Sequence, residues 1–476
     1  MSIPGLGQAA PAAAFSAPIL EAPVAVHELQ ANSEWRFEVE IGEKIDVKIL
    51  SGTAEIFGTE LAVNHLYTFR GVKSSIYTWH GCRIEVTGTC EEYTAEETPM
   101  TQYVNTHFAL EKLRDEAAQN GREGPRVLVV GPTNAGKTSL VKLLTAYSLR
   151  MGRQPMVINT DSREGLLSIP GSLTATPFAS IIDVEQGWGS SPTSTSSPIP
   201  VKLPLCYYYG LPSPEDNTKL YKPIITRLAL ASTSRLTDDP AIKATGMIID
   251  TPGVISQGKG GFDLISHIVS EFSVNTVLVI GSERLHSEML RKFSTYRTST
   301  GETITLVKLD KSGGCVDRDE TFTHQTNEAA IKEYFFGNAR TTLSPHTQTI
   351  GYDDLLIYKI REGIYLISAP IVDPSLHSIA HANSFLPGGV EETEQGLFEK
   401  VEPNPSMQHC ILAVMYATVN DSQDAVRDAS VMGFVYVAEV DETKRRLRVL
   451  QPMSTRITDR PLIWGSWPEA AVSLVG

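Results

Sequence analysis

Apolar and polar residues alternate with a period of two over much of the first hundred positions. EWRFEVEIGEKIDVKIL, HLYTFR, SSIYTWH and CRIEVTG place apolar side chains at alternate positions, and turn-forming residues separate them. This spacing predicts short antiparallel strands with one buried face. We therefore expect a small β-sandwich or barrel over residues 27–100. The preceding residues, 1–26, are rich in Ala and Pro and lack the basic start of a signal peptide, so they are predicted to be a disordered tail.

The next segment has the spacing and composition of a helix. NTHFALEKLRDEAAQNG, residues 105–121, consists mainly of good helix formers and ends in glycine. It predicts a connecting helix within residues 101–124.

Continuous apolar runs replace the alternation from residue 125. Runs of this kind are typical of strands buried on both faces of a parallel sheet, and here helical or loop text separates them. They predict a doubly wound, mostly parallel sheet over residues 125–345. A Ser- and Pro-rich stretch at 187–204 is expected to be a flexible insertion. The predicted buried strands are PRVLVV (125–130), PMVINTD (155–161), GMIID (246–250), NTVLVIG (275–281) and TITLVKLD (303–310).

Alternation returns towards the C-terminus. LLIYKI, GIYLISAP, HCILAVMYATV, GFVYVAEVD and RRLRVLQPM all read as strands. They predict a third, β-rich α/β domain over residues 346–476.

Composition and charge restrict the class of protein. The chain is 41% hydrophobic and 20% charged, as in ordinary globular proteins, and its net charge of −14 argues against broad adhesion to nucleic acid or anionic membranes. The five cysteines are scattered without a CxxC pair, so neither a disulfide framework nor a zinc site is expected. The sequence contains no run of about 18 consecutive apolar residues, so no membrane span is expected.

A phosphate-binding motif lies directly after the first buried strand. Gly131-Pro-Thr-Asn-Ala-Gly136-Lys137-Thr138 fits G-x-x-x-x-G-K-[ST] and precedes a helical pattern. The glycines let backbone N–H groups face phosphate oxygens, the lysine neutralises them, and the threonine hydroxyl can ligate Mg²⁺. The residues expected to contact the nucleotide are Gly131, Thr133, Asn134, Ala135, Gly136, Lys137, Thr138 and Ser139.

Two enzyme classes remain open from the motif alone. Asp250-Thr-Pro-Gly253 matches the D-x-x-G of GTPases, and Lys308-Leu-Asp310 resembles their guanine-reading K-x-D. A kinase acting on an external hydroxyl would instead need a carboxylate near the acceptor. Asp161, after the strand that follows the phosphate loop, is a candidate for that base or for a metal ligand acting through water.

Longer stretches carry a more specific resemblance. EWRFEV (34–39), AEIFGTEL (54–61), TWHG, TPM, NTHFALE, LSIPG, KSGG, EYFFG and Ser344-Pro-His346 occur in this order around the phosphate loop. With these motifs the chain resembles the RNA 5′-hydroxyl kinase family that includes the Clp subunit of the mRNA 3′-end cleavage and polyadenylation factor. The resemblance covers the chain from about residue 27 to the final strands.

The resemblance implies a fold, ligands and partners. The expected fold is α/β, with a central P-loop domain between an N-terminal β-sandwich-like domain and a small C-terminal α/β domain. ATP with Mg²⁺ would lie between the first two domains, contacted by Glu34 and Lys73. The implied partners are the Pcf-type subunit that binds the RNA polymerase II tail and other subunits of the complex. RNA would bind mostly through that complex, in the nucleus.

Three regions depart from the active kinases of this family. Their D-V-G-Q motif is Asp161-Ser-Arg163-Glu164 here, and their RNA-stacking Trp is Val254. Their arginine-rich lid keeps only Arg318. These departures predict that ATP is bound mainly as a structural ligand, with little or no kinase activity. In the alternative, an active polynucleotide 5′-hydroxyl kinase, Lys137 and Arg318 would stabilise the transferring phosphoryl group and Asp161 would act as base.

Overall fold

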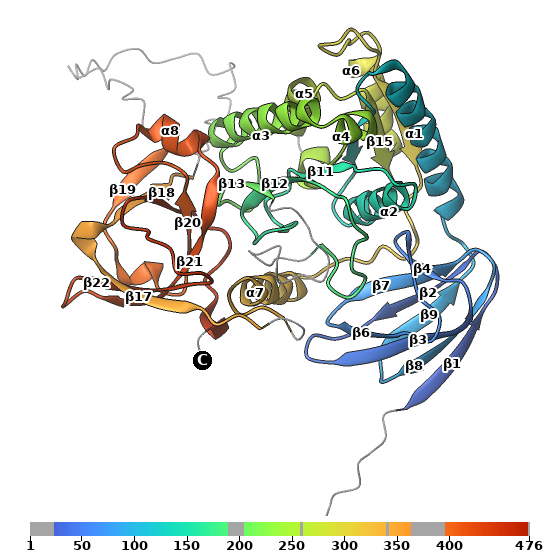
Figure 1. The fold of residues 1–476 in the computed structure, drawn as a ribbon, viewed down its shortest axis with the longest axis horizontal. Helices are drawn as coiled ribbons and strands as arrows, with labels where there is room; N and C mark the ends of the chain where they lie inside the picture. The colour runs from blue at the N-terminus through green and yellow to red at the C-terminus, as the bar shows by residue number, and fades with distance from the viewer. Residues whose placement is uncertain (1–22, 189–203, 258–259, 339–341, 363–395, 475–476) are drawn as a thin grey trace, which may run out of the picture.

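The computed structural model describes residues 23–188, 204–257, 260–338, 342–362 and 396–474. A blue N-terminal domain, a central domain and an orange-red C-terminal domain follow one another along the molecule (Figure 1). The predicted fold class, an α/β P-loop domain flanked by a β-sandwich and a smaller α/β domain, is confirmed. Most of the predicted tail, most of the 187–204 insertion and the strand expected at GIYLISAP lie outside the described residues.

The N-terminal domain is a sandwich of two antiparallel sheets. Their strand orders are β1-β8-β3-β6 and β5-β4-β7-β2-β9. Alternate side chains point inwards, and the stacked rings of Trp35 and Phe37 lie in the shared core. The first strand begins at Val24, three residues before the predicted boundary. The bounds are β1 Val24–Leu29, β2 Ser33–Glu38, β3 Lys44–Gly52, β4 Glu55–Ile56, β5 Thr59–Glu60, β6 Leu66–Arg70, β7 Lys73–Thr78, β8 Cys82–Thr87 and β9 Glu91–Ala95.

A long helix, α1 (Met100–Asn120), connects the sandwich to the central domain. It ends at Gly121, whose left-handed φ of 64° lets its N–H bond to the carbonyl of Ala117. This is the glycine that the sequence pattern placed at the helix end. The buried face of α1 includes Arg114 and His107.

His107 makes the stability of this packing depend on pH. Its ring is 3% exposed, lies 5.2 Å from that of Tyr147, and its Nδ1 has no hydrogen-bond partner within the described structure. Burial lowers the pKa of His107 to about 4. The neutral form is therefore favoured in the fold, and its stabilisation is complete above pH ~6.5 and is lost as pH falls towards 4. Between pH 7 and pH 5 we expect a loss of about 2 kcal/mol in unfolding free energy from this residue.

Urea unfolding at the two pH values, on the chain and on His107→Leu, measures this contribution. The variant should lose about 2 kcal/mol less than the parent on acidification. Equal losses would show that His107 does not carry the pH dependence.

The central domain contains a seven-stranded sheet of order β13-β12-β11-β14-β10-β15-β16. Strands β11, β14, β10, β15 and β16 run parallel, as predicted, whereas β12 and β13 extend the sheet in antiparallel orientation. The added pair was not predicted, because SLTATP is weakly apolar and β13 follows the Ser/Pro-rich stretch. The bounds are β10 Arg126–Val130, β11 Met156–Asn159, β12 Ser172–Pro177, β13 Leu205–Tyr208, β14 Met247–Asp250, β15 Thr276–Ile280 and β16 Thr305–Leu309.

Helices cover both faces of this sheet. Leu128 and Val130 of β10 belong to the core shared with α3 and α5, and Val127 and Val129 belong to the core shared with α1 and α2. The continuous apolar run of β10 therefore reflects burial on both faces of the sheet. The helices are α2 Lys137–Arg150, α3 Thr218–Asp238, α4 Pro240–Thr245, α5 Gly261–Glu271, α6 Glu283–Phe293 and α7 Glu320–Phe336, with a 3₁₀ turn, η1, at Val254–Ser256.

The C-terminal domain is a seven-stranded mixed sheet of order β17-β22-β21-β20-β23-β18-β19, with β18 and β23 parallel. The hydroxyl of Tyr334 in α7 accepts a hydrogen bond from the N–H of Phe434 at 3.1 Å. This bond joins the C-terminal domain to the central domain. The bounds are β17 His346–Gly351, β18 Leu356–Ile360, β19 Phe398–Val401, β20 Ile411–Met415, β21 Val431–Asp441, β22 Arg446–Gln451, β23 Pro461–Trp464, α8 Gln423–Asp428 and the 3₁₀ turns Tyr352–Asp354, Pro405–Met407 and Val472–Leu474.

None of the helices in the described part of the chain is long and apolar enough to span a membrane.

Candidate nucleotide-binding site

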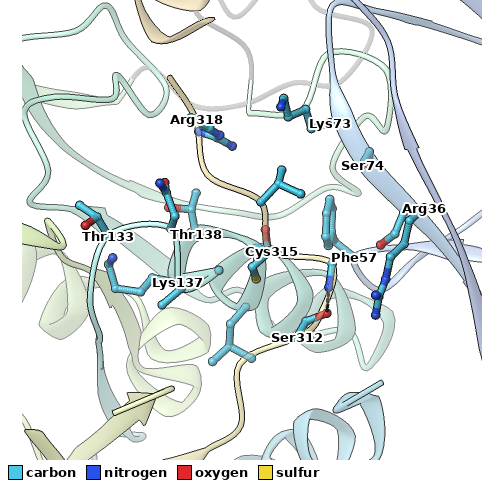
Figure 2. Close-up of a pocket in the computed structure, with 18 of the residues that line it drawn as sticks. Arg36, Phe57, Lys73, Ser74, Thr133, Lys137, Thr138, Ser312, Cys315 and Arg318 are labelled. Atoms are coloured by element: carbon cyan, nitrogen blue, oxygen red, sulfur yellow. Dashed lines mark hydrogen bonds between the residues drawn. The ribbon is translucent and has the colours of Figure 1, made fainter. Parts of the chain in front are cut away.

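A cavity of about 660 Å³ lies where the sandwich, α1 and the central domain meet. Its size is within the usual range for small-molecule sites. Figure 2 shows P-loop side chains such as Lys137 and Thr138 on one side of it and Arg36, Lys73 and Ser74 of the sandwich on the other. The predicted residues Glu34, Lys73, Asp161 and Arg318 and the loop residues 133–139 all line this cavity.

The phosphate loop is shaped by two left-handed residues. Asn134 has φ 56° and Gly136, at the start of α2, has φ 84°. Lys137 is buried, and its Nζ donates to the carbonyl of Pro132 at 2.9 Å. Gly131 does not line the cavity; its N–H bonds to the Ser256 hydroxyl at 3.2 Å, which fixes the start of the loop. The loop thus has the form of a phosphate cradle with its lysine already inside it.

An oxygen-rich corner lies beside the cradle. The Thr138 hydroxyl donates to Asp250 Oδ2 at 2.5 Å, and Asp161 follows the neighbouring parallel strand. Burial raises the pKa of Asp250 to about 6, and burial together with Glu164 raises the pKa of Asp161 to about 7. A hydroxyl and carboxylates at the carboxyl ends of parallel strands suit Mg²⁺ that keeps water and phosphate ligands.

These oxygens do not form a complete cage of their own. Among the described residues, no three His, Cys, Asp or Glu side chains come together as a protein-borne metal site. A partial ligand set is expected when phosphate oxygens supply the rest. Mg²⁺ binding here stays a prediction.

The sandwich contributes a buried ion pair to the cavity wall. Glu34 is 5% exposed, and the Nε of Arg36 donates to its Oε1 at 2.7 Å. Burial raises the pKa of Glu34, although Arg36 opposes this shift. Lys73 pairs with Glu38 at 2.7 Å. Composition alone would have placed Glu34 and Lys73 on an exposed strand, whereas both face the cavity; their contact with a nucleotide stays a prediction.

The three departures from active kinases meet in the same cavity. The lid cation Arg318 forms an ion pair with Glu164, Nη1 to Oε2 at 3.0 Å. The Arg163 side chain is exposed, and its backbone N–H donates to Asp161 Oδ1 at 2.9 Å. Val254 lines the cavity with an aliphatic side chain. Arg318 is therefore paired with the carboxylate that replaces the family's neutral amide.

Several cavity residues were not predicted as nucleotide contacts. Asp250 does not line the cavity itself but accepts a hydrogen bond from Thr138, which does. It was considered only as part of a GTPase motif, although an aspartate ending a buried strand next to the P-loop strand was a usable signal. Arg36, Phe57, Tyr103 and Cys315 had no local signal, because they come from four distant segments. The Tyr103 hydroxyl donates to the carbonyl of Asp310 at 2.8 Å.

The guanine-reading part of the GTPase interpretation has no support in this arrangement. Lys308 pairs with Glu283, and the Asp310 carboxylate accepts from Gln102 at 2.7 Å. Neither Lys308 nor Asp310 is among the cavity-lining residues described.

Gly136 offers a direct test of the cradle. A Cβ at this position would lie 2.8 Å from Cys315 Sγ, and its φ of 84° disfavours any side chain. Relief of the added contact and of roughly 1–2 kcal/mol of backbone strain would move the loop away from the conformation that binds phosphate, so Gly136→Ala should weaken ATP binding by about tenfold. Isothermal titration with ATP·Mg²⁺ measures the change. Gly152→Ala is the matched control, since Gly152 has φ 72° and open space around it; an equal loss there would contradict the local explanation.

Comparison with known families covers nearly all of the chain. Residues 28–117 match the family described as "N-terminal beta-sandwich domain of polyadenylation factor". Residues 131–337 match "mRNA cleavage and polyadenylation factor CLP1 P-loop", and 343–469 match "Pre-mRNA cleavage complex II protein Clp1". The three matches follow the three domains of the structure.

Curated relatives and solved structures agree with these matches. The mRNA cleavage and polyadenylation factor clp1 of Botryotinia fuckeliana is 71% identical over the full length of both chains, and that of Phaeosphaeria nodorum is 47% identical, also over the full length of both. A solved Clp1p–Pcf11p complex superposes with a TM-score of 0.80 at 29% identity, covering 94% of this chain and 99% of that one. A second, with the same figures, describes ATP loss in a glycine-to-arginine point mutant. The chain belongs to the Clp1 family of mRNA cleavage and polyadenylation factors.

Proposed function

We propose that this chain is the ATP-binding subunit of the pre-mRNA 3′-end cleavage and polyadenylation machinery (cleavage factor I), required for endonucleolytic cleavage before polyadenylation, and that ATP·Mg²⁺ is mainly its structural ligand. The observation that carries the proposal is a preformed phosphate cradle inside a cavity shared by two domains. A ligand that bridges two domains stabilises their joint arrangement by mass action.

Each part of the cavity has a separate task in this proposal. The backbone of residues 131–139 binds the phosphates, Lys137 neutralises them, and Thr138 with Asp250 and Asp161 holds Mg²⁺. Glu34 and Lys73 of the sandwich contact the nucleotide from the opposite wall. Bound Mg²⁺ supplies charge neutralisation for the triphosphate.

The same geometry argues against efficient transfer to RNA. A cation that neutralises the transferring phosphoryl group accounts for a large part of the rate in related enzymes. Here Arg318 is neutralised by Glu164 at 3.0 Å. Val254 has no aromatic face on which a terminal base could stack, an interaction that is worth about 1–3 kcal/mol elsewhere.

One observation favours the kinase alternative. Asp161 lies in the cavity with its pKa raised to about 7, close to the value that suits a general base at neutral pH. In that function Asp161 would accept the proton of an RNA 5′-hydroxyl, and Lys137 and Arg318 would stabilise the charge that develops.

A partner follows from the family relationship. The related structures are complexes of Clp1p with Pcf11p. We propose that a Pcf11-type subunit, which also contacts the RNA polymerase II tail, binds this chain together with the rest of the processing complex. RNA would be reached mainly through that complex, and the site of action would be the nucleus.

Two measurements separate the structural role from the kinase role. Protein purified without added nucleotide is denatured, and the released nucleotide is identified by chromatography; stoichiometric ATP supports a structural ligand. A short RNA with a 5′-hydroxyl is then incubated with the chain and radiolabelled ATP. Turnover near ordinary kinase rates of about 1–100 s⁻¹, lost in Lys137→Met, would reject the structural proposal. ADP or no nucleotide in the first measurement would also count against it.

A further inference from the structure

Residues 310–322, which we call the strap, connect β16 to the first turn of α7, and several of them line the cavity. In Figure 2 the trace that carries Ser312, Cys315 and Arg318 passes between the P-loop residues and the sandwich residues. One end is fixed to α1, because Gln102 and the Tyr103 hydroxyl both bond to Asp310. The strap therefore touches the elements that enclose the nucleotide site.

The sandwich holds the strap from one side. Arg36 packs so closely on Gly314 that a Cβ there would lie 2.7 Å from its Nε, and a Cβ on Gly313 would lie 3.3 Å from its Nη1. Further along, Lys73 Nζ lies 5.2 Å from the centre of the Phe322 ring, a cation–π contact. Two residues of the sandwich thus contact the strap, Arg36 at Gly313 and Gly314 and Lys73 at its last residue, Phe322.

The P-loop holds the strap from the other side. Cys315 Sγ lies against Gly136, and Asn134 Nδ2 donates to Asp317 Oδ1 at 3.2 Å. The strap therefore lies against the cradle itself, and a triphosphate leaving towards this side would have to open these contacts.

The last contact links the strap to the turn after β11. Arg318 Nη1 and Glu164 Oε2 lie 3.0 Å apart, with their side chains 41% and 45% exposed. These residues are 154 positions apart in sequence, one on the strap and one on the turn after β11, and both line the cavity. Since a contact between two segments of the cavity wall must break before those segments can separate, the pair has the position of a latch.

We propose that the strap controls nucleotide exchange and that the Arg318–Glu164 ion pair is its latch. This inference rests on the proposed ATP binding. The latch slows both entry and release, because the ion pair must break before the two segments can separate and let the nucleotide pass. Its effect is on rates and is modest, since ion pairs of this exposure are weak.

The experiment uses the full chain and a fluorescent ATP analogue with Mg²⁺. Stopped-flow displacement by excess ATP gives the release rate, and rapid mixing gives the association rate. Glu164→Gln and Arg318→Gln should each speed release by about two- to fivefold. The double variant should be no faster than the single variants, because all three break the same contact. Glu288→Gln is the matched control: it removes the carboxylate of an Arg284–Glu288 pair on α6, joined at 2.9 Å.

The outcomes are distinct. Faster release in both single variants without additivity, and no change in Glu288→Gln, supports the latch. Unchanged release in the variants overturns it while leaving ATP binding established. Slower release in Glu164→Gln also overturns it, because Arg318 would then have moved from the carboxylate to the phosphates. If the parent chain itself fails to bind the analogue or ATP, the proposed function fails and not only the latch.

Discussion

Lys137→Met should leave a folded chain that no longer retains ATP. The Lys137 ammonium is buried at the start of α2 and already lies inside the loop, bonded to the carbonyl of Pro132. Methionine keeps the length and apolar stem of the side chain and removes the charge. Losing one partner of a buried, charged contact costs about 2–5 kcal/mol, which weakens binding at least about 30-fold. Nucleotide content after purification and isothermal titration with ATP·Mg²⁺ measure the loss.

The fold of this variant needs a separate check. Circular dichroism should be unchanged, because Lys137 contributes no cross-domain hydrogen bond in the described structure. Lys112→Met, on the exposed side of α1, is the control and should bind ATP as the parent does. Stoichiometric ATP in purified Lys137→Met would contradict the assignment of the loop as the main phosphate contact.

Local patterns in the sequence predicted the frame of the site. The apolar run of β10, the glycine-rich loop and the following helix are adjacent in sequence, so their geometry depends on neighbouring residues. The burial of β10 on both faces follows from the same run. For this reason the phosphate loop and the parallel strands could be predicted without any knowledge of contacts between distant residues.

Contacts between distant segments could not be predicted in the same way. Glu34 belongs to an alternating strand, and only the three-dimensional arrangement shows that it is buried beside Arg36. Glu164 looked like a departure from the active kinases and Arg318 like the one arginine kept in the lid, but their ion pair joins the two residues into one feature. No periodicity in the sequence encodes such a pairing. The resemblance identified the residues, and the structure supplied their partners.

Arg114→Met should lower the free energy of unfolding by about 3–5 kcal/mol, because it weakens the packing of the connecting helix α1 on the central domain. Arg114 is 1% exposed in α1. Its Nε donates to the carbonyl of Thr245 at 3.0 Å, and its Nη1 donates to Glu111 at 2.5 Å and to Ser148 at 2.8 Å. Methionine fills a similar space but leaves these acceptors without their shared donor. Urea unfolding, followed by tryptophan fluorescence, measures the change in free energy.

The size of this effect depends on the carboxylate left behind, and a second variant tests that explanation. Glu111 keeps one partner in Arg114→Met, since Arg153 Nε lies 2.9 Å from it. Replacing both members, as in Arg114→Met with Glu111→Leu, removes the buried charge and should recover at least about 1 kcal/mol of the loss. Arg284→Met breaks an exposed pair instead and should cost no more than about 1 kcal/mol. If Arg114→Met lowers the free energy of unfolding as little as Arg284→Met does, the burial of the Arg114–Glu111 pair does not decide how much the pair contributes to stability.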